Sequence, residues 1–288
     1  CMSSKGLNTK QVGDLFGVDE STVRRWALSG KIKCNSSAGG HRKFSFKNII
    51  SFSKSNKVKI NSEVLEDSLN SNQSIENILD FSLALKSDSI ESILVKLYLS
   101  GVNLSKIMDD YIEPVLVKIQ KKLDSGKISV AEEHIARKII SKSLNNFKDS
   151  ITSYNANNNK NVLCLNLEND IPDLPIDMIQ ILLESINFSV DNCGSHTSVV
   201  DLKKLLDNKK YDAIFIYMCD RQCCTSTVKD NIDKTNMDLY EISMLAKKYN
   251  IKLFLGGPSF KSIKSDTLKC FNTFTKYSES LLINNFLD

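Results

Sequence analysis

The sequence lacks any long apolar run. None of its 288 residues belongs to a stretch that approaches the roughly 18 to 20 apolar residues of a membrane span. The opening residues Cys1-Met2-Ser3-Ser4 contain no apolar signal region. These absences predict a cytoplasmic protein with no membrane partner. Hydrophobic residues still make up 41% of the chain, enough to bury the cores of two or three domains, so a disordered chain is excluded.

Arrangements typical of catalysis are also missing. The chain has only three histidines, and it contains no nucleophile–base pair, acidic dyad, phosphate-binding loop or glycine-rich dinucleotide turn. We therefore expect no enzymatic activity. The eight cysteines are predicted to be reduced thiols and not a disulfide framework, because the chain is expected in the cytosol.

Two short helices are predicted near the amino terminus. Residues 9–16 are amphipathic, residues 17–19 read Gly-Val-Asp and form a tight turn, and residues 20–28 form a second helix. This spacing fits a helix-turn-helix. Asp19 is placed to cap the second helix and Gly30 to end it.

The second helix has a polar face and an apolar face. We expect Val23, Trp26 and Leu28 to turn inward. The exposed face should carry hydroxyl and guanidinium groups suited to base edges and phosphates, namely Ser21, Thr22, Arg24 and Arg25.

A glycine pair and a basic run follow. Gly39-Gly40 supplies the sharp turn of a hairpin. His41, Arg42 and Lys43 are then predicted at the hairpin tip, where a wing contacts the DNA backbone or the minor groove. With the helix pair, this motif resembles the winged helix of the MerR and excisionase type, whose wing commonly reads Gly-Gly-His-Arg, then a basic and an aromatic residue. The resemblance covers residues 7–52 and implies binding to a double-stranded DNA operator.

Charge is concentrated in the same segment. Residues 1–60 hold twelve Lys or Arg and three Asp or Glu, a net charge of +9, whereas the remaining residues carry a net charge of −5. A phosphate-binding surface needs such a local excess, because released counterions supply much of the affinity.

The rest of the chain is predicted to form a linker and two further domains. After a winged helix-turn-helix domain at residues 1–55, residues 56–73 are rich in Ser, Asn and Lys and predict a linker. A four-helix bundle is expected at 74–156, since helical periodicity recurs over 75–86, 89–100, 104–124 and 129–150.

Beyond residue 160 the pattern changes to short apolar strands alternating with amphipathic helices. The predicted strands are 162–167, 213–218 and 252–255, and the predicted helices are 174–187, 198–208 and 234–249. This alternation predicts a flavodoxin-like, doubly wound parallel sheet at 160–288. The fold class is thus multidomain, α and α/β.

The order of these parts resembles a family, the light- and cobalamin-responsive MerR-type repressors. In that family a winged helix precedes the four-helix and flavodoxin-like cobalamin-binding unit that also occurs in methionine synthase and corrinoid proteins. Residues 123–134 resemble its helical signature of a Trp, nine residues and then Glu-His. Glu133 and His134 keep the final pair, and Leu123 replaces the Trp. A hydrogen-bonded helical pair is the alternative interpretation of Glu133 and His134.

Other motifs of that family are altered. Residues 170–175 align with its Asp-x-His-x-x-Gly loop, so Asp170 is kept, Pro172 replaces the cobalt-binding His and Pro175 replaces the Gly. Tyr217 stands at or near the position of the family's small hydroxyl residue beside the nucleotide tail and would crowd that channel, whereas Gly256-Gly257 keeps the family form. We therefore expect a cobalamin fold that has lost its cobalamin and holds no cofactor. Adenosylcobalamin bound atypically, haem or another tetrapyrrole is the alternative.

Three cysteines follow the predicted third strand. Cys219, Cys223 and Cys224 would lie at the ligand-binding end of the sheet. Zinc binding, a redox switch and pigment attachment are alternatives, but the spacing is poor for a metal, and we expect ordinary thiols and no metal site.

The sequence as a whole predicts a transcriptional regulator, a repressor, whose body forms a homo-oligomer, either a dimer or a tetramer. The alternatives are a ligand- or light-sensing regulator with a different cofactor, and a corrinoid carrier protein. An antirepressor protein that docks on the DNA-binding module is a further partner to consider.

Overall fold

The computed structural model describes residues 6–37, 39–61, 64, 71–152, 160–168, 173–219 and 231–283. Contacts between residues divide the chain into two compact units. The first contains residues 1–121 and 134–152, and the second contains residues 122–133 and 153–288. None of the described helices combines the length and the apolarity needed to cross a membrane.

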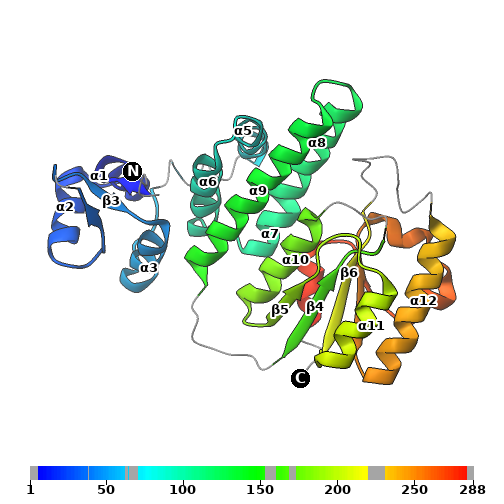
Figure 1. Cartoon of the computed structure of the whole chain (residues 1–288). Coiled ribbons are helices and arrows are strands. Elements are labelled where there is room, and N and C mark those ends of the chain that lie inside the picture. Colours follow the sequence, from blue (N-terminus) through cyan, green and yellow to red (C-terminus); the bar gives the residue numbers. More distant parts are fainter. Residues whose placement is uncertain are drawn as a thin grey trace. The chain divides into compact units, whose positions relative to one another are not determined.

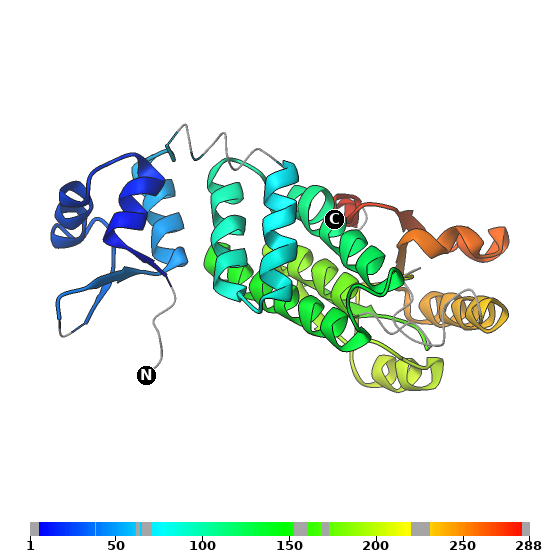
Figure 2. The same ribbon diagram turned by 90° about the horizontal axis from the view of Figure 1, so that it is seen from above.

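The first unit begins with three helices and a small sheet (Figure 2). The helices are α1 (Thr9–Phe16), α2 (Glu20–Leu28) and α3 (Phe46–Asn56). The strands β1 (Leu7–Asn8), β2 (Asn35–Ser36) and β3 (Arg42–Phe44) pair antiparallel in the order β1-β3-β2. The predicted helix pair and hairpin are therefore both present.

Caps fix where the first two helices begin and end. The Asn8 side chain accepts a hydrogen bond from the Gln11 backbone N–H at 2.8 Å. In turn, the Gln11 side-chain oxygen accepts one from the Asn8 backbone N–H at 2.9 Å. Gly17 ends α1 in the left-handed region at φ 67°. Asp19 caps α2 as predicted, since its Oδ1 accepts from the Ser21 N–H at 2.9 Å.

The core of this module is apolar and partly aromatic. Val23 is fully buried, as predicted, and Trp26 packs between Phe16 and Phe52 with centroid distances of 6.1 and 4.7 Å. Leu28 contradicts the prediction, because it is 76% exposed. It is the last residue of α2, where the helix ends before its next turn could reach the core.

Two described helices extend into the predicted linker of residues 56–73. Helix α3 continues to Asn56, and Lys57 caps it in the left-handed region. Helix α5 (Ser71–Leu83) already begins at Ser71. The Ser- and Asn-rich composition obscured these helix ends, because such residues favour caps and turns yet are tolerated in terminal helical turns.

The remaining helices follow the predicted bundle pattern. They are α6 (Ser87–Leu99), α7 (Leu104–Ile107), α8 (Glu113–Asp124) and α9 (Val130–Ile151). A π-helical turn at Met108–Ile112 joins α7 to α8, so the predicted third helix is continuous but irregular. Apolar residues at three- and four-residue spacing fill the interior, including Ile78, Ile90, Leu94, Met108, Leu144 and Phe147.

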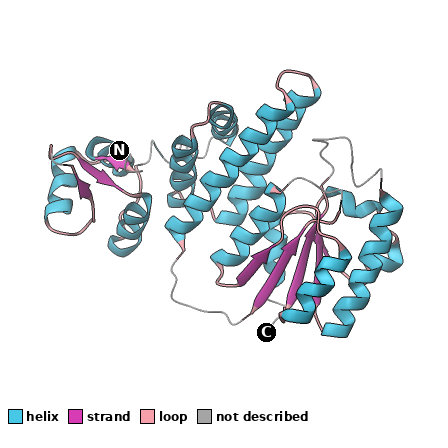
Figure 3. Cartoon of the chain, in the orientation of Figure 1, coloured by secondary structure: helices cyan, strands magenta, loops and turns pink. Residues whose placement is uncertain are grey.

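The second unit contains a five-stranded parallel sheet (Figure 3). Its strands are β4 (Asn161–Leu165), β5 (Ser189–Asn192), β6 (Ala213–Tyr217), β7 (Lys252–Gly256) and β8 (Asn272–Phe274). They lie in the order β5-β4-β6-β7-β8, all parallel. This is the doubly wound order of flavodoxin-like folds, and the predicted parallel α/β class is confirmed.

Helices cover both faces of that sheet. Helices α11 (Val199–Asn208) and α12 (Ile232–Tyr249) lie side by side on one face (Figure 1). Helix α10 (Leu174–Ser185) lies on the other face with the 3-10 turns at Tyr277–Ile283. A short helix, α13 (Ser265–Leu268), precedes β8.

Candidate functional site

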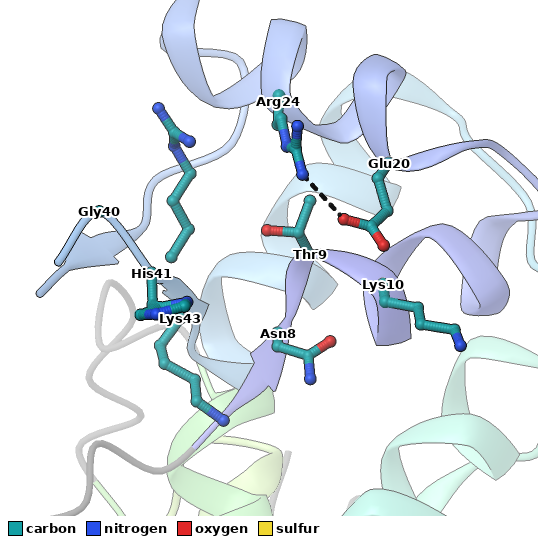
Figure 4. Close-up of a pocket in the computed structure, with 9 residues that line it drawn as sticks. Asn8, Thr9, Lys10, Glu20, Arg24, Gly40, His41 and Lys43 are labelled. Atoms are coloured by element: carbon teal, nitrogen blue, oxygen red, sulfur yellow. Dashed lines mark hydrogen bonds and ion pairs between the residues drawn. The ribbon is translucent and has the colours of Figure 1, made fainter.

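A hollow of about 540 Å³ lies in the amino-terminal module (Figure 4). The start of α1, the first turns of α2 and the hairpin enclose it. Its lining residues are Asn8, Thr9, Lys10, Glu20, Arg24, Gly40, His41, Arg42 and Lys43. We call this set the basic hollow, because it holds four Lys or Arg side chains and a histidine against a single carboxylate. A concave, cationic surface of this kind suits a phosphate or another anion.

Helix α2 carries two guanidinium groups, of which Arg24 lines the basic hollow. Arg24 is exposed and donates to the Glu20 carboxylate at 3.1 Å (Figure 4). Arg25 is exposed and donates to the Thr22 hydroxyl at 3.0 Å. Exposed ion pairs four residues apart on a helix contribute only about 0.3–0.5 kcal/mol. Arg24 can therefore exchange Glu20 for a stronger anionic partner at little cost.

The cap of α2 also affects its polar face. Hydrogen bonds hold the pKa of Asp19 below its ordinary value, first from the Ser21 hydroxyl and then from the backbone N–H groups of Thr22 and Ser21. The carboxylate is thus ionised at the helix N-terminus, where negative charge is favoured. Ser21, predicted to face DNA, is exposed but commits its hydroxyl hydrogen to this cap.

The hairpin places its basic residues differently from the prediction. Its turn is closed by the Ser37 N–H donating to the His41 carbonyl at 3.0 Å, and Gly40 adopts φ 75°. His41 is exposed beside the turn. Arg42 and Lys43, predicted at the tip, belong to β3 and are half-buried, because they pair with Ser36 and Asn35 across the ladder.

Four lining residues were not among the predicted DNA-binding residues: Asn8, Thr9, Lys10 and Glu20. Their helices were predicted, but the approach of α1 to the hairpin depends on β1. That strand is two residues long and carries no periodic signal. The local excess of basic residues was the available clue to Lys10.

A second candidate surface is the carboxyl edge of the parallel sheet, where ligands of such folds bind. Much of the predicted ligand pocket falls outside the described residues, namely Asp170, Pro172, Cys223 and Cys224. Cys219 is buried at the end of β6. Within the described parts of the chain, no group of three His, Cys, Asp or Glu residues is placed to hold a metal ion.

The described part of that edge is filled by the protein's own side chains. A Cβ on Gly256 would lie 2.1 Å from the Phe274 ring, and one on Gly257 would lie 2.3 Å from the Met218 carbonyl oxygen. The Tyr217 ring stacks on the Tyr277 ring, with centroids 5.6 Å apart. The space beside β6 and β7 is thus occupied by packing within the described part of the sheet.

The residues of the helical signature differ in how far they are buried. Leu123, in the last turn of α8, is half-buried. Glu133 is fully buried in the first turn of α9, whereas His134 is exposed. Pro175, predicted in a loop, lies in the first turn of α10 and is buried there. Proline is tolerated at that position because its missing N–H would have no helical partner.

Comparison with known proteins gives a family match and a shared fold. Residues 75–148 match the family model described as "B12 binding domain". The Methanosarcina barkeri monomethylamine corrinoid protein is 10% identical with a TM-score of 0.56, over 75% of this chain and 99% of that chain. No curated protein matches the chain by sequence.

Two further structures are similar over comparable lengths. A cobalamin-binding protein from Desulfitobacterium hafniense DCB-2 is 12% identical with a TM-score of 0.37, over 76% of this chain and 99% of that one. The methanol:cobalamin methyltransferase complex MtaBC from Methanosarcina barkeri is 14% identical with a TM-score of 0.36, over 78% and 83%.

These findings contradict the expectation that the protein holds no cofactor. The match of residues 75–148 to a B12-binding domain points to a cobalamin-type ligand, and the fold is shared with a corrinoid protein. The expectation was wrong because it rested on substituted positions taken one at a time. The helical segment matches a B12-binding domain as a whole, and one of the altered positions, Pro172, lies outside the described residues.

Proposed function

We propose that the chain is a corrinoid-binding transcriptional regulator, a repressor, that binds duplex DNA through residues 6–61. The basic hollow carries this proposal, because a corrinoid-binding body alone has no need of it. The family match at residues 75–148 and the fold shared with a corrinoid protein support the corrinoid part.

The helix and hairpin of the module are compatible with binding to B-form DNA. An α-helix fits the major groove, and α2 offers Arg24 and Arg25 on its exposed face. The hairpin would then lie along the phosphate backbone, with Arg42 and Lys43 beside the same hollow. The net charge of +9 on residues 1–60 supplies the general attraction to phosphates.

Binding to DNA can be tested on the full chain with selected and random duplexes. We expect Arg42→Ala to weaken binding to all duplexes alike and to reduce the salt slope by about 1. Arg24→Ala should cost about 1–3 kcal/mol on the selected sequence and relax its specificity, if the guanidinium contacts a guanine. Lys203→Ala, an exposed lysine of α11, is the matched control. Equal affinities for all four proteins would refute the DNA-binding proposal.

The second candidate function is that of a corrinoid carrier. It is favoured by the similarity to the monomethylamine corrinoid protein, 99% of which aligns with this chain. A carrier would bind a corrinoid and present it to a methyltransferase, with no affinity for DNA. Titration of the full chain with hydroxocobalamin, followed by absorbance, tests the part that both candidates share. Uptake of corrinoid without DNA binding would favour the carrier, and no uptake would contradict both.

A further inference from the structure

Helix α12 exposes a row of large apolar side chains. Met237, Tyr240 and Met244 are 64%, 57% and 50% exposed, although α12 packs against the sheet on its other side. That packed side is formed by Thr235, Asn236, Leu239, Ile242, Ser243 and Ala246. Burying three such side chains would remove several hundred Å² of apolar surface from water, and a contiguous exposed patch of this kind marks an interaction surface.

Charges of opposite sign lie at the two ends of this row. Asp233 is exposed four residues before Met237, and Lys247 is exposed three residues after Met244. The exposed positions 233, 237, 240, 244 and 247 therefore alternate in steps of four and three, as in the contact seam of paired helices. Lys248 extends the basic end. We call these residues the α12 seam.

We propose that the α12 seam binds the α12 seam of a second copy of this chain, with the two helices antiparallel. In this arrangement Tyr240 meets Tyr240 of the second copy, and Met237 lies opposite Met244. The acidic end of each helix then reaches the basic end of the other, so that Asp233 faces Lys247 and Lys248. A parallel pair would bring like charges together at both ends.

Two neighbouring lysines have partners in their own chain. Lys248 donates to the Tyr249 hydroxyl at 3.2 Å, so Lys247 is the main partner proposed for Asp233. Lys234 is already paired with Glu168 and Asp238 of its own chain. Glu241 lies beside Tyr240 and is exposed, at the rim of the seam where solvent screens charge repulsion. A contact related by a twofold axis is self-complementary and closes at two copies, which predicts a dimer.

This proposal does not rest on DNA or corrinoid binding, so it is tested without either. Sedimentation velocity of the full chain over a wide concentration range should show a monomer–dimer equilibrium. Met237→Glu with Met244→Glu should raise the dissociation constant by at least about tenfold, since it places four carboxylates in the seam. Val200→Glu is the matched control, because Val200 is 66% exposed on the neighbouring helix α11, and it should leave the equilibrium unchanged.

A charge exchange tests the orientation of the helices. Asp233→Lys should weaken the dimer, and adding Lys247→Asp and Lys248→Asp to the same chain should restore it. A monomer at all concentrations, or a dimer indifferent to the methionine changes, would overturn the proposal. Failure of the triple variant to restore the dimer would overturn the antiparallel arrangement. Circular dichroism identifies any variant that does not fold, and the charge exchange then decides, because its residues are exposed.

Discussion

At the scale of single residues, one carboxylate tunes the basic hollow. Among the described residues that line it, Glu20 is the only acidic one, and its carboxylate pairs with Arg24 at 3.1 Å. Both side chains are largely exposed, so the pair does little for the stability of the helix. Its main effect is on what the hollow attracts, because a carboxylate beside a phosphate repels it and also occupies the nearest guanidinium.

Removing that carboxylate should strengthen binding to DNA. We expect Glu20→Gln to lower the dissociation constant for random duplexes by a few-fold, about 1 kcal/mol, since it removes a negative charge and releases Arg24. Fluorescence anisotropy at two salt concentrations measures this change. Glu76→Gln is the control, because Glu76 pairs with Lys118 at 2.8 Å in the helical region of the first unit. Weaker binding by Glu20→Gln would mean that Glu20 itself contacts a base.

A second residue-scale prediction concerns acid. Hydrogen bonds from Lys209 at 2.5 Å and Tyr211 at 2.6 Å hold the pKa of Asp191 below its ordinary value of 3.8. The folded state thus favours the carboxylate. The resulting stability is fully present above the unfolded pKa and is lost as the pH falls through the lower folded pKa.

Asp191→Asn should therefore lower the free energy of unfolding at neutral pH by about 1 kcal/mol or less, because solvent screens the half-exposed pair. The difference from the unmodified protein should vanish as the pH falls well below 3.8. Urea denaturation across this range measures it. Asp266→Asn, which removes a fully solvated pair with Lys269, should show no such pH dependence. A difference that grows in acid would contradict the assignment.

At the scale of elements, β7 packs against β8 through a glycine on β7 and an aromatic ring on β8. Gly256 and Phe274 are partners in the parallel register, and the ring lies where a Cβ of residue 256 would be. Phe274 also contacts Phe215 of β6, with centroids 6.0 Å apart. Gly256 is thus required by packing within the sheet, whatever its part in ligand binding.

The two positions should be strongly coupled. Gly256→Ala is expected to destabilise the protein by about 2 kcal/mol or more, because a buried ring must move. In a Phe274→Leu background, the same change should cost much less. A double-mutant cycle from urea denaturation measures the coupling. Additive effects would show that the ring yields without strain.

The success of sequence reasoning also differs between elements. The helices of the bundle and the buried strands β4, β6 and β7 were predicted, because their periodicity reflects burial. The two edge strands were not predicted, because edge strands are short and polar. They are β5, with the sequence Ser-Val-Asp-Asn, and the three-residue β8. Sequence reasoning foresaw α2 and the hairpin at the basic hollow, but not the contribution of α1 or the place of Arg42 within β3.

The same limit applied to the cofactor. Tyr217 was expected to crowd the channel of a nucleotide tail. Its stacking on Tyr277 was not foreseeable, because 60 residues separate the two rings. Comparison with the family motifs one residue at a time gave such substitutions too much weight and led to the expectation of no cofactor. The likeness of a whole helical segment to a B12-binding domain is information that no single position carries.

At the scale of the whole molecule, a basic module is joined to a body of opposite net charge. Residues 1–60 carry +9 and the rest −5. Under the proposed function we therefore expect the module, and not the body, to attract DNA phosphates. If α12 pairs two copies, each dimer offers two modules to one duplex, which raises the affinity through effective concentration.

The regulator and the carrier differ in one thermodynamic quantity. If corrinoid binding changes the affinity for DNA by some factor, DNA must change the affinity for corrinoid by the same factor, since the two are linked through the same states. For the proposed regulator we expect a factor of about 5 to 150, corresponding to about 1–3 kcal/mol. For a carrier that does not bind DNA there is no such factor.

Two titrations measure this factor. Calorimetric titration with hydroxocobalamin, with and without saturating duplex, gives the effect of DNA on the affinity for corrinoid. Titration with DNA, with and without hydroxocobalamin, gives the effect of corrinoid on the affinity for DNA. Arg42→Ala separates the two sites, because it should weaken DNA binding and leave the affinity for corrinoid in the absence of DNA unchanged. Tight binding of both ligands with no mutual effect would rule out corrinoid control of DNA binding and leave the two parts of the chain with independent roles.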